Sequence, residues 1–197
     1  MRKLALIGSG AVVAVMATLL FFRQSSDAQQ SSVKPQEVAA AVKLAPGDTA
    51  RLPGPRQPIF FRHDIHAGQY QIPCQYCHST VAVSSEPGIP SMQTCMGCHL
   101  VIGGTDSSAK AEIKKLRQAA GDKKPTEWVR VHRVAQHAHF PHQRHIKALG
   151  PTACFTCHGN VSRMPQVYQV NNVNNMGWCV SCHLSRQVNR DCTSCHY

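Results

Sequence analysis

The sequence predicts a mostly irregular chain with short α-helices, preceded by one transmembrane helix and built around a core that its own side chains do not supply. Three observations indicate this fold class. Ten cysteines and twelve histidines occur in 197 residues, a content typical of disulfides, metal sites or a covalently held cofactor. Only 6% of the residues are aromatic, so an ordinary protein core would be thin. A long uncharged run also follows a basic N-terminus.

The uncharged run, Leu4 to Phe22, is long enough to span a membrane. As an α-helix it would extend over about 28 Å, close to the thickness of a bilayer's hydrocarbon core. Arg2 and Lys3 precede it and are expected to stay on the cytoplasmic side. A cleaved signal peptide is the alternative, with residues 26–28 as the cleavage site. We expect a retained anchor over residues 1–23, because the run exceeds the usual apolar region of a signal peptide.

Every cysteine belongs to a Cys-x-x-Cys pair that is followed at once by a histidine. Two thiols one helical turn apart can form thioethers with the two vinyl groups of one porphyrin, and the next imidazole then binds the iron from the proximal side. A zinc ribbon needs pairs of pairs, and five is odd. A disulfide scaffold explains neither the fixed spacing nor the histidine. We therefore predict five c-type haems. The attachment cysteines are Cys74 and Cys77, Cys95 and Cys98, Cys154 and Cys157, Cys179 and Cys182, and Cys192 and Cys195. The proximal iron ligands are His78, His99, His158, His183 and His196.

Part of the chain is an internal repeat. The segment 61–66, Phe-Arg-His-Asp-Ile-His, precedes Cys74 as the segment 140–145, Phe-Pro-His-Gln-Arg-His, precedes Cys154. A methionine also stands three residues before the first cysteine of the motif that follows in each half. The chain therefore contains a two-haem unit twice, with a fifth haem appended at Cys192.

The paired histidines carry a resemblance to a known class. Two histidines at i and i+3 on one helical turn can send their rings to different haems. The arrangement resembles the cytochrome c3/c7 class of multihaem cytochromes c, in which Phe-x-His-x-x-His supplies distal ligands to two haems in a haem-stacked core. The resemblance implies four distal iron ligands, namely His63, His66, His142 and His145. We assign the fifth to His132, with His137 and His139 as substitutes. Met92 and Met176 are further alternates, since methionine sulfur can ligate haem iron, although packing on the porphyrin face would equally explain both.

These motifs define the organisation of the chain. After the anchor we expect an extended Pro/Ser/Gln linker over 24–58 and a pentahaem cytochrome c domain over 59–197. The domain divides into a two-haem repeat at 59–100, a helical and basic connector at 101–131, a two-haem repeat at 132–184 and a fifth haem at 185–197. The best helix candidate is Ser108 to Ala120, with an apolar stripe through Leu116 and a stop at Gly121. Short helices are also expected at each attachment motif.

The charge of the chain needs a separate explanation. A formal charge of +11 and a pI near 9.4 would usually indicate a nucleic acid or an anionic membrane as partner. Five haems would, however, bring ten propionates that the formal count omits. Ten Lys or Arg against three acids between Lys110 and Lys147 suit pairing with these carboxylates. We predict no nucleic-acid partner.

The whole chain is similar to the pentahaem cytochrome c subunit of bacterial alternative complex III. The likeness is carried by the single anchor, the five motifs in 2+2+1 order, and the segments 128–132 (Trp-Val-Arg-Val-His) and 176–179 (Met-Gly-Trp-Cys). It implies an electron-relay subunit that is not itself an enzyme and has no catalytic residue. Its partners would be integral-membrane quinol-binding subunits, an iron–sulfur subunit, and a monohaem cytochrome c or copper-protein acceptor. The chain would be a single-pass protein of the bacterial inner membrane, with its N-terminus inside and its haem domain periplasmic.

Two alternatives remain open at this level. A membrane-anchored multihaem quinol dehydrogenase would oxidise quinol itself. That family typically has methionine two or three residues after its first attachment histidine, whereas residues 79–81 here are Ser-Thr-Val. The chain could also be the relay subunit of another molybdopterin-type oxidoreductase. A multihaem reductase with lysine in place of a motif histidine is disfavoured, because all five motifs have histidine.

Overall fold

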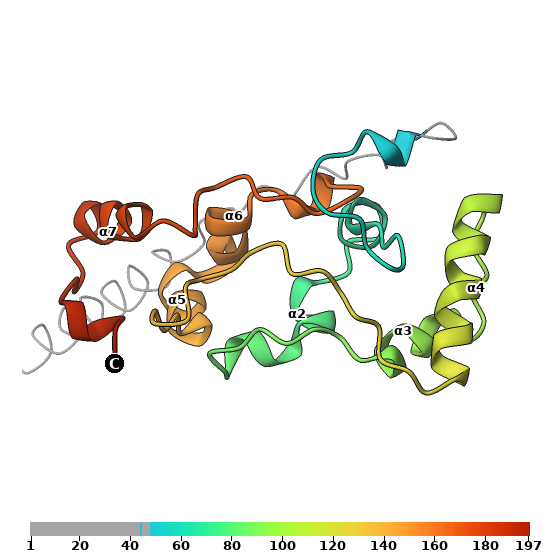
Figure 1. Cartoon of the computed structure of the whole chain (residues 1–197), viewed down its shortest axis with the longest axis horizontal. Helices are drawn as coiled ribbons and strands as arrows, with labels where there is room; N and C mark the ends of the chain where they lie inside the picture. The colour runs from blue at the N-terminus through green and yellow to red at the C-terminus, as the bar shows by residue number, and fades with distance from the viewer. Residues whose placement is uncertain (1–43, 45–47) are drawn as a thin grey trace, which may run out of the picture. The chain divides into compact units, whose positions relative to one another are not determined.

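The computed structural model describes residue 44 and residues 48–197, which form short helices joined by loops and contain no β-strand (Figure 1). The α-helices are α2 (Cys74–Cys77), α3 (Met92–His99), α4 (Ser107–Gly121), α5 (His142–Leu149), α6 (Ala153–His158) and α7 (Met176–Ser185). The shorter turns are η1 (Asp48–Ala50), η2 (Asp64–Gln69), η3 (Ser79–Ala82), η4 (Gly150–Thr152), η5 (Val161–Arg163) and η6 (Cys192–Ser194). The mostly irregular, helical fold class is confirmed for this part of the chain.

The predicted membrane anchor, residues 1–23, lies outside the described residues, as does most of the predicted linker at 24–58. Within the part that the structure describes, no helix has the length and apolar character that crossing a bilayer requires.

The longest described helix is the one that the apolar stripe predicts. It was expected at 108–120 and is found as α4, one residue longer at each end. Asp106 caps its N-terminus, since the carboxylate accepts a hydrogen bond of 2.9 Å from the backbone N–H of Ala109. Leu116 faces inward and is only 6% exposed, and α4 packs along α3.

Short helices carry the attachment motifs, as expected. The first four cysteine pairs lie on α2, α3, α6 and α7, and the fifth lies at the turn η6. In an α-helix, residues i and i+3 stand on the same face, so both thiols of a pair point to one side. The following histidine falls at or just after the end of the turn that carries its cysteines, except in α7, which runs on for two more residues.

The first histidine segment is held against a distant part of the chain. It forms the π-helical turn η2, which packs on η5. The N–H of Asp64 donates to the carbonyl of Met164 at 3.2 Å, and Arg62 forms an ion pair with the buried carboxylate of Asp64. A β-carbon on Gly68 would stand 2.3 Å from the carbonyl oxygen of Ser162, so only glycine allows this approach.

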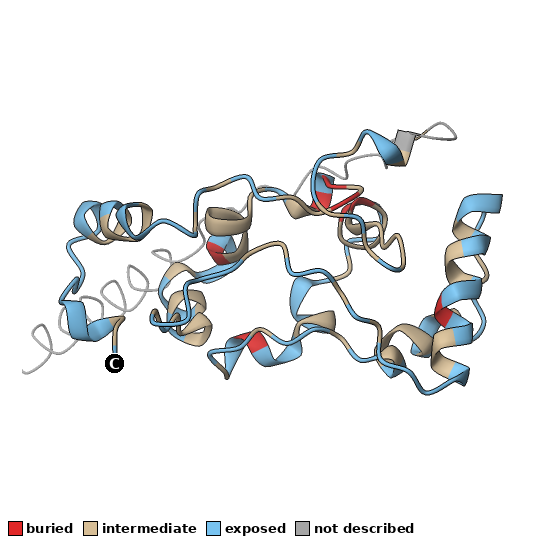
Figure 2. Cartoon of the chain, in the orientation of Figure 1, coloured by how far each residue is buried: buried red, intermediate tan, exposed pale blue. Residues whose placement is uncertain are grey.

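The described side chains form little core of their own. Four apolar residues are buried, namely Val81, Leu116, Ala153 and Met164. Figure 2 shows these buried positions scattered over separate elements, with intermediate or exposed residues between them. A chain with so little internal apolar contact is expected to obtain its core from bound apolar groups.

Candidate haem-attachment sites

Five local sites follow from the cysteine motifs, and we number them in chain order. Site 1 is Cys74, Cys77 and His78; site 2 is Cys95, Cys98 and His99; site 3 is Cys154, Cys157 and His158; site 4 is Cys179, Cys182 and His183; site 5 is Cys192, Cys195 and His196. All ten cysteines are free in the structure, as thioether formation requires.

Four of the five motif histidines share one backbone interaction. In each, the ring Nδ1 donates a hydrogen bond to a main-chain carbonyl, which fixes the tautomer and leaves Nε2 with the lone pair that a metal needs. The acceptors are Gly88 for His78 (2.9 Å), Ile102 for His99 (3.1 Å), Asn189 for His183 (2.5 Å) and His137 for His196 (2.8 Å).

Three of the predicted distal histidines show the same pattern. Nδ1 of His66 donates to the carbonyl of Arg62 at 2.8 Å, and Nδ1 of His145 donates to that of Pro141 at 3.0 Å. Both bonds close one helical turn. Nδ1 of His142 instead reaches the carbonyl of Ser85 at 2.5 Å, fifty-seven residues away. These rings are thus also oriented with Nε2 available.

Burial keeps several of these imidazoles neutral. Desolvation is the main cause that lowers the pKa of His63 to about 4 and that of His158 to about 4. The pKa of His132 is lowered for the same reason. Neutral imidazole is the form that binds iron. Two ring nitrogens, Nδ1 of His63 and Nε2 of His132, are buried without a hydrogen-bond partner. A metal ligand would account for an orphaned buried Nε2.

The structure pairs predicted distal rings with motif rings. Two metal–imidazole bonds of about 2 Å each, with the ring radii added, would place two axial rings roughly 6 Å apart. The centroids of His66 and His99 are 5.9 Å apart, and those of His145 and His183 are 6.1 Å apart. Each pair is therefore spaced to take one iron between its rings, at sites 2 and 4.

Sites 1 and 3 have neighbours that are less simply paired. After burial, His78 makes the largest contribution to the lowered pKa of His63. Three histidines act on His158, because His132, His142 and His78 all lower its pKa after the larger effect of burial. The ring of His132 meets that of His158 edge to face, with centroids 4.4 Å apart and planes at 87°.

The two histidine segments reproduce each other's geometry. Phe61 stands 4.7 Å from His63 at 86° and stacks on His66 at 4.3 Å. Phe140 stands 4.7 Å from His142 at 83° and stacks on His145 at 4.1 Å. The repeat predicted from the sequence thus extends to ring positions, although η2 and α5 differ in helix type. One phenylalanine orients both histidines of its segment.

The alternate ligands have other contacts. The ring centroids of His137 and His196 are 5.4 Å apart, and the His137 carbonyl accepts the hydrogen bond from Nδ1 of His196. His139 stacks on Tyr197 at 4.3 Å. The sulfur of Met92 accepts a hydrogen bond from Thr126, and Met176 is exposed. His137 thus remains a substitute ligand for site 5.

Thiols of different sites also lie near each other. The interaction between Cys74 and Cys154 lowers the pKa of Cys74 and raises that of Cys154. Burial and then the nearby Cys98 thiol raise the pKa of Cys77. Burial and then the nearby Cys77 thiol raise the pKa of Cys95. The pKa of Cys157 is raised by burial and by the nearby thiols of site 4.

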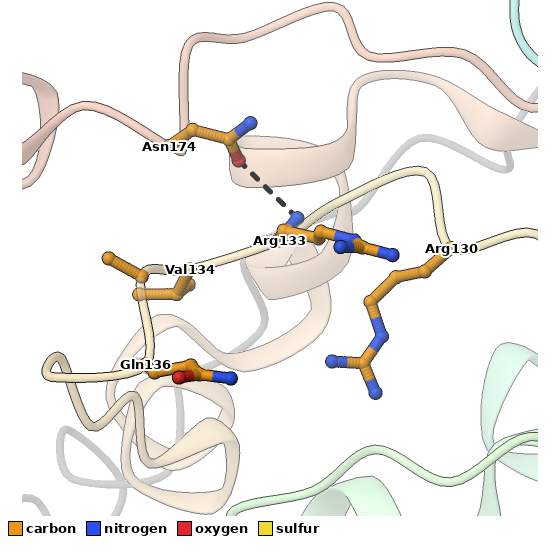
Figure 3. A pocket seen from close by; sticks show the side chains of 6 residues that line it. Arg130, Arg133, Val134, Gln136 and Asn174 are labelled. Carbon is orange, nitrogen blue, oxygen red and sulfur yellow. Dashed lines mark hydrogen bonds between the residues drawn. The ribbon is translucent and has the colours of Figure 1, made fainter.

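Two basic side chains flank His132 in the sequence, Arg130 of the predicted connector and Arg133 of the predicted second repeat. They line a pocket with Gln136 and Asn174, and Figure 3 shows both guanidinium groups on the same side of the loop that carries them. The N–H of Arg133 donates to the Asn174 side chain at 3.4 Å. Paired arginines with no carboxylate in the pocket lining suit an anionic group such as a propionate.

Sequence reasoning missed the carbonyls that orient the histidines and the arginine that supports site 2. Arg117 on α4 donates to the carbonyl of His99 at 2.8 Å and to those of Leu100 and Ile102 at 3.4 Å. It therefore caps the C-terminus of α3 with a cation. A carbonyl acceptor depends on backbone path and leaves no residue signal, except at Gly88, where a positive φ of 69° requires glycine.

Comparison with known proteins agrees with this chemistry. Residues 38–133, which contain sites 1 and 2, match the model of the class III cytochrome c family. Over 102 residues the chain is 28% identical to the menaquinone reductase, multiheme cytochrome c subunit, of Nitratidesulfovibrio vulgaris strain Hildenborough. That match covers 52% of this chain and 45% of the relative, so the chain spans less than half the length of the protein it matches. These similarities support a c-type multihaem protein that carries electrons.

Proposed function

We propose that this chain, which is similar to multihaem c-type cytochromes, holds five haems and relays electrons between a membrane quinone-reacting partner and a second redox protein. The observation that carries the proposal is the shared orientation of the histidines. At sites 1, 2, 4 and 5 the proximal ring donates from Nδ1 to a carbonyl and leaves Nε2 for iron. A solvated surface histidine has no reason to repeat this arrangement.

The residues of each site have distinct tasks. When bound, a haem supplies one-electron redox chemistry at its iron. Each pair of thiols adds across two vinyl groups and so holds the porphyrin covalently. The carbonyl partners prevent the imidazoles from rotating, and burial keeps them neutral. The distal set that we propose is His63, His66, His132, His142 and His145, with the pairing at sites 2 and 4 supported by the ring separations.

We assign the chain the role of a relay and not of an enzyme. An iron with two histidine ligands has no open position for a substrate. As partners we propose integral-membrane quinol-binding subunits and an iron–sulfur subunit on one side, and a monohaem cytochrome c or copper protein on the other, as in alternative complex III. The domain would lie on the periplasmic side of the bacterial inner membrane, tethered by residues 1–23.

A second candidate differs in the direction of electron flow. The relative named as a menaquinone reductase subunit favours a complex in which electrons pass toward the quinone. Both candidates use the same five sites, so the sites alone do not decide between them.

Haem counting tests the chemistry first. Intact-mass analysis of the purified protein should give five haems per chain, because all ten cysteines stand in complete motifs. Replacing both Cys192 and Cys195 by alanine should leave four. A wild-type chain with fewer than five haems would contradict the proposal.

The direction of electron flow can be tested in the purified membrane complex. If the chain serves quinol oxidation, a menaquinol analogue should reduce its haems, as seen in the visible absorption bands, and an inhibitor of the quinone site should stop this reduction. If the haems respond only to a reduced periplasmic cytochrome, and the quinone analogue then reoxidises them, the quinone-reducing role holds instead.

A further inference from the structure

We propose that the five haems follow one another in space in the order of sites 2, 1, 3, 4 and 5, so that the haems of sites 2 and 5 are the ends of the electron path. The inference rests on the proposed function, because it needs a haem at each site. It also differs from the order along the chain, in which site 1 would be an end.

Site 2 adjoins site 1 through a shared pair of histidines. His66 stands 5.9 Å from His99 of site 2. His63, one helical turn away on the same segment, is buried close to His78 of site 1. Two rings from one turn can serve two haems only if those haems are neighbours. The cysteines are consistent with this, because Cys98 of site 2 lies near Cys77 of site 1.

Site 1 adjoins site 3 through packing and a side-chain hydrogen bond. Turn η3, which directly follows site 1, packs on α5, and α5 packs on α6, which carries site 3. The ring of His142 on α5 also donates to the carbonyl of Ser85, just beyond η3, at 2.5 Å. The second repeat is therefore attached to the first at site 1 and not at site 2.

Site 3 is followed by site 4 and then by site 5. His183 of site 4 donates from Nδ1 to the carbonyl of Asn189 at 2.5 Å, and the Asn189 side chain donates to the hydroxyl of Ser194, between the cysteines of site 5, at 2.9 Å. His145 on α5 reaches His183 with centroids 6.1 Å apart. Figure 1 shows the same succession of the helices that carry sites 2, 1, 3 and 4, which is α3, α2, α6 and α7.

Site 2 is bordered by a helix that carries no motif. Among the described elements, α3 packs mainly on α4. The far side of site 2 is covered by α4, where Arg117 holds the carbonyl of His99. An electron that enters at site 2 must then pass site 1 before it reaches the second repeat.

Anomalous scattering from iron in crystals of the haem-loaded full chain would test this order directly. We expect the iron of site 2 to have a single near neighbour, that of site 1, and the iron of site 1 to lie between those of sites 2 and 3. An iron of site 2 that lies between sites 1 and 3 would overturn the inference. Fewer than five irons would instead contradict the proposed function, and the order of the irons present would still decide this inference.

A matched pair of variants provides a solution test. His66→Met and His63→Met change one distal residue each on the same helical turn, and methionine raises the potential of the haem it ligates. Neighbouring haems respond because charges interact over short distances. In potentiometric titrations followed by electron paramagnetic resonance, His66→Met should shift its own haem and one other, and His63→Met its own and two others. Two shifted neighbours for His66→Met would contradict the terminal position of site 2.

Discussion

At the scale of single residues, the orientation of the imidazoles is set more by the backbone than by side chains. Carbonyl oxygens from segments far apart in the sequence, such as Ser85 and His137, receive the Nδ1 protons. These bonds leave Nε2 of each ring available to iron. A ligand substitution should therefore change the coordination of one haem only.

His142 allows a direct test of a distal ligand. In His142→Ala, one haem should change from low spin to high spin, because its iron loses one axial nitrogen. The measurement is the visible and electron paramagnetic resonance spectrum of the oxidised protein. His139→Ala is the control and should keep every haem low spin, since His139 stacks on Tyr197. An unchanged spectrum in His142→Ala would remove this residue from the distal set.

Gly88 should matter for both stability and site 1. Its φ is 69° and its carbonyl accepts the His78 hydrogen bond, while a β-carbon would stand 2.5 Å from Oγ1 of Thr80. Gly88→Ala should therefore lower the free energy of unfolding by about 1–2 kcal/mol. Thermal unfolding followed by circular dichroism would measure the loss.

Gly97 is the matched control for that substitution. It lies inside α3 at an ordinary φ, and no other protein atom stands within 4 Å of the position of its β-carbon. Gly97→Ala should leave stability unchanged or raise it by up to about 1 kcal/mol, as alanine does in helices. Equal destabilisation by both substitutions would show that the carbonyl position of Gly88 has no special part.

At the scale of elements, α4 acts as a support for site 2. Its Arg117 caps the carbonyl end of α3, and its Glu112 accepts a hydrogen bond of 2.8 Å from the N–H of Phe60, just before the first histidine segment. The helix α4 thus contacts both the backbone at His99 of site 2 and the backbone just before the segment 61–66, which holds the proposed distal residue.

Arg117→Ala should destabilise the protein by about 1 kcal/mol, since three carbonyls at a helix C-terminus lose a cationic donor. The midpoint of thermal unfolding and the spectrum of the site 2 haem should both change. Lys114→Ala on the same helix removes a charge without these contacts, and its unfolding midpoint should match that of the wild type. A loss of the same size in both variants would indicate a general charge effect.

The elements show how far sequence patterns reach. The 3.6-residue stripe predicted α4 to within one residue at each end, and the cysteine spacing predicted the helices of the motifs. The π-helical form of η2 was not predictable, because it depends on the contact between Gly68 and Ser162, almost a hundred residues apart. The nearness of three other histidines to His158 was hidden for the same reason, since His78, His132 and His142 come from other parts of the chain.

At the scale of the whole molecule, haem loading should lower the net positive charge of the protein. In the reduced protein, where each iron–porphyrin unit is neutral, the formal count of +11 falls to about +1 if five haems add ten ionised propionates, since 11 − 10 = 1. Isoelectric focusing of the haem-loaded chain should then give a pI well below the sequence value of 9.4. Focusing near 9.4 would indicate that the propionates are few or that they are protonated.

The contact between the thiols of Cys74 and Cys154 has a consequence for biosynthesis. On the proposed function the two sulfurs bind different porphyrins, yet in the folded chain each shifts the pKa of the other. If the chain folded before its thiols were capped, an oxidising compartment could couple them and close both sites to their cofactors. On this proposal, cofactor attachment at this junction precedes folding, and the nascent chain stays reduced until both thioethers have formed.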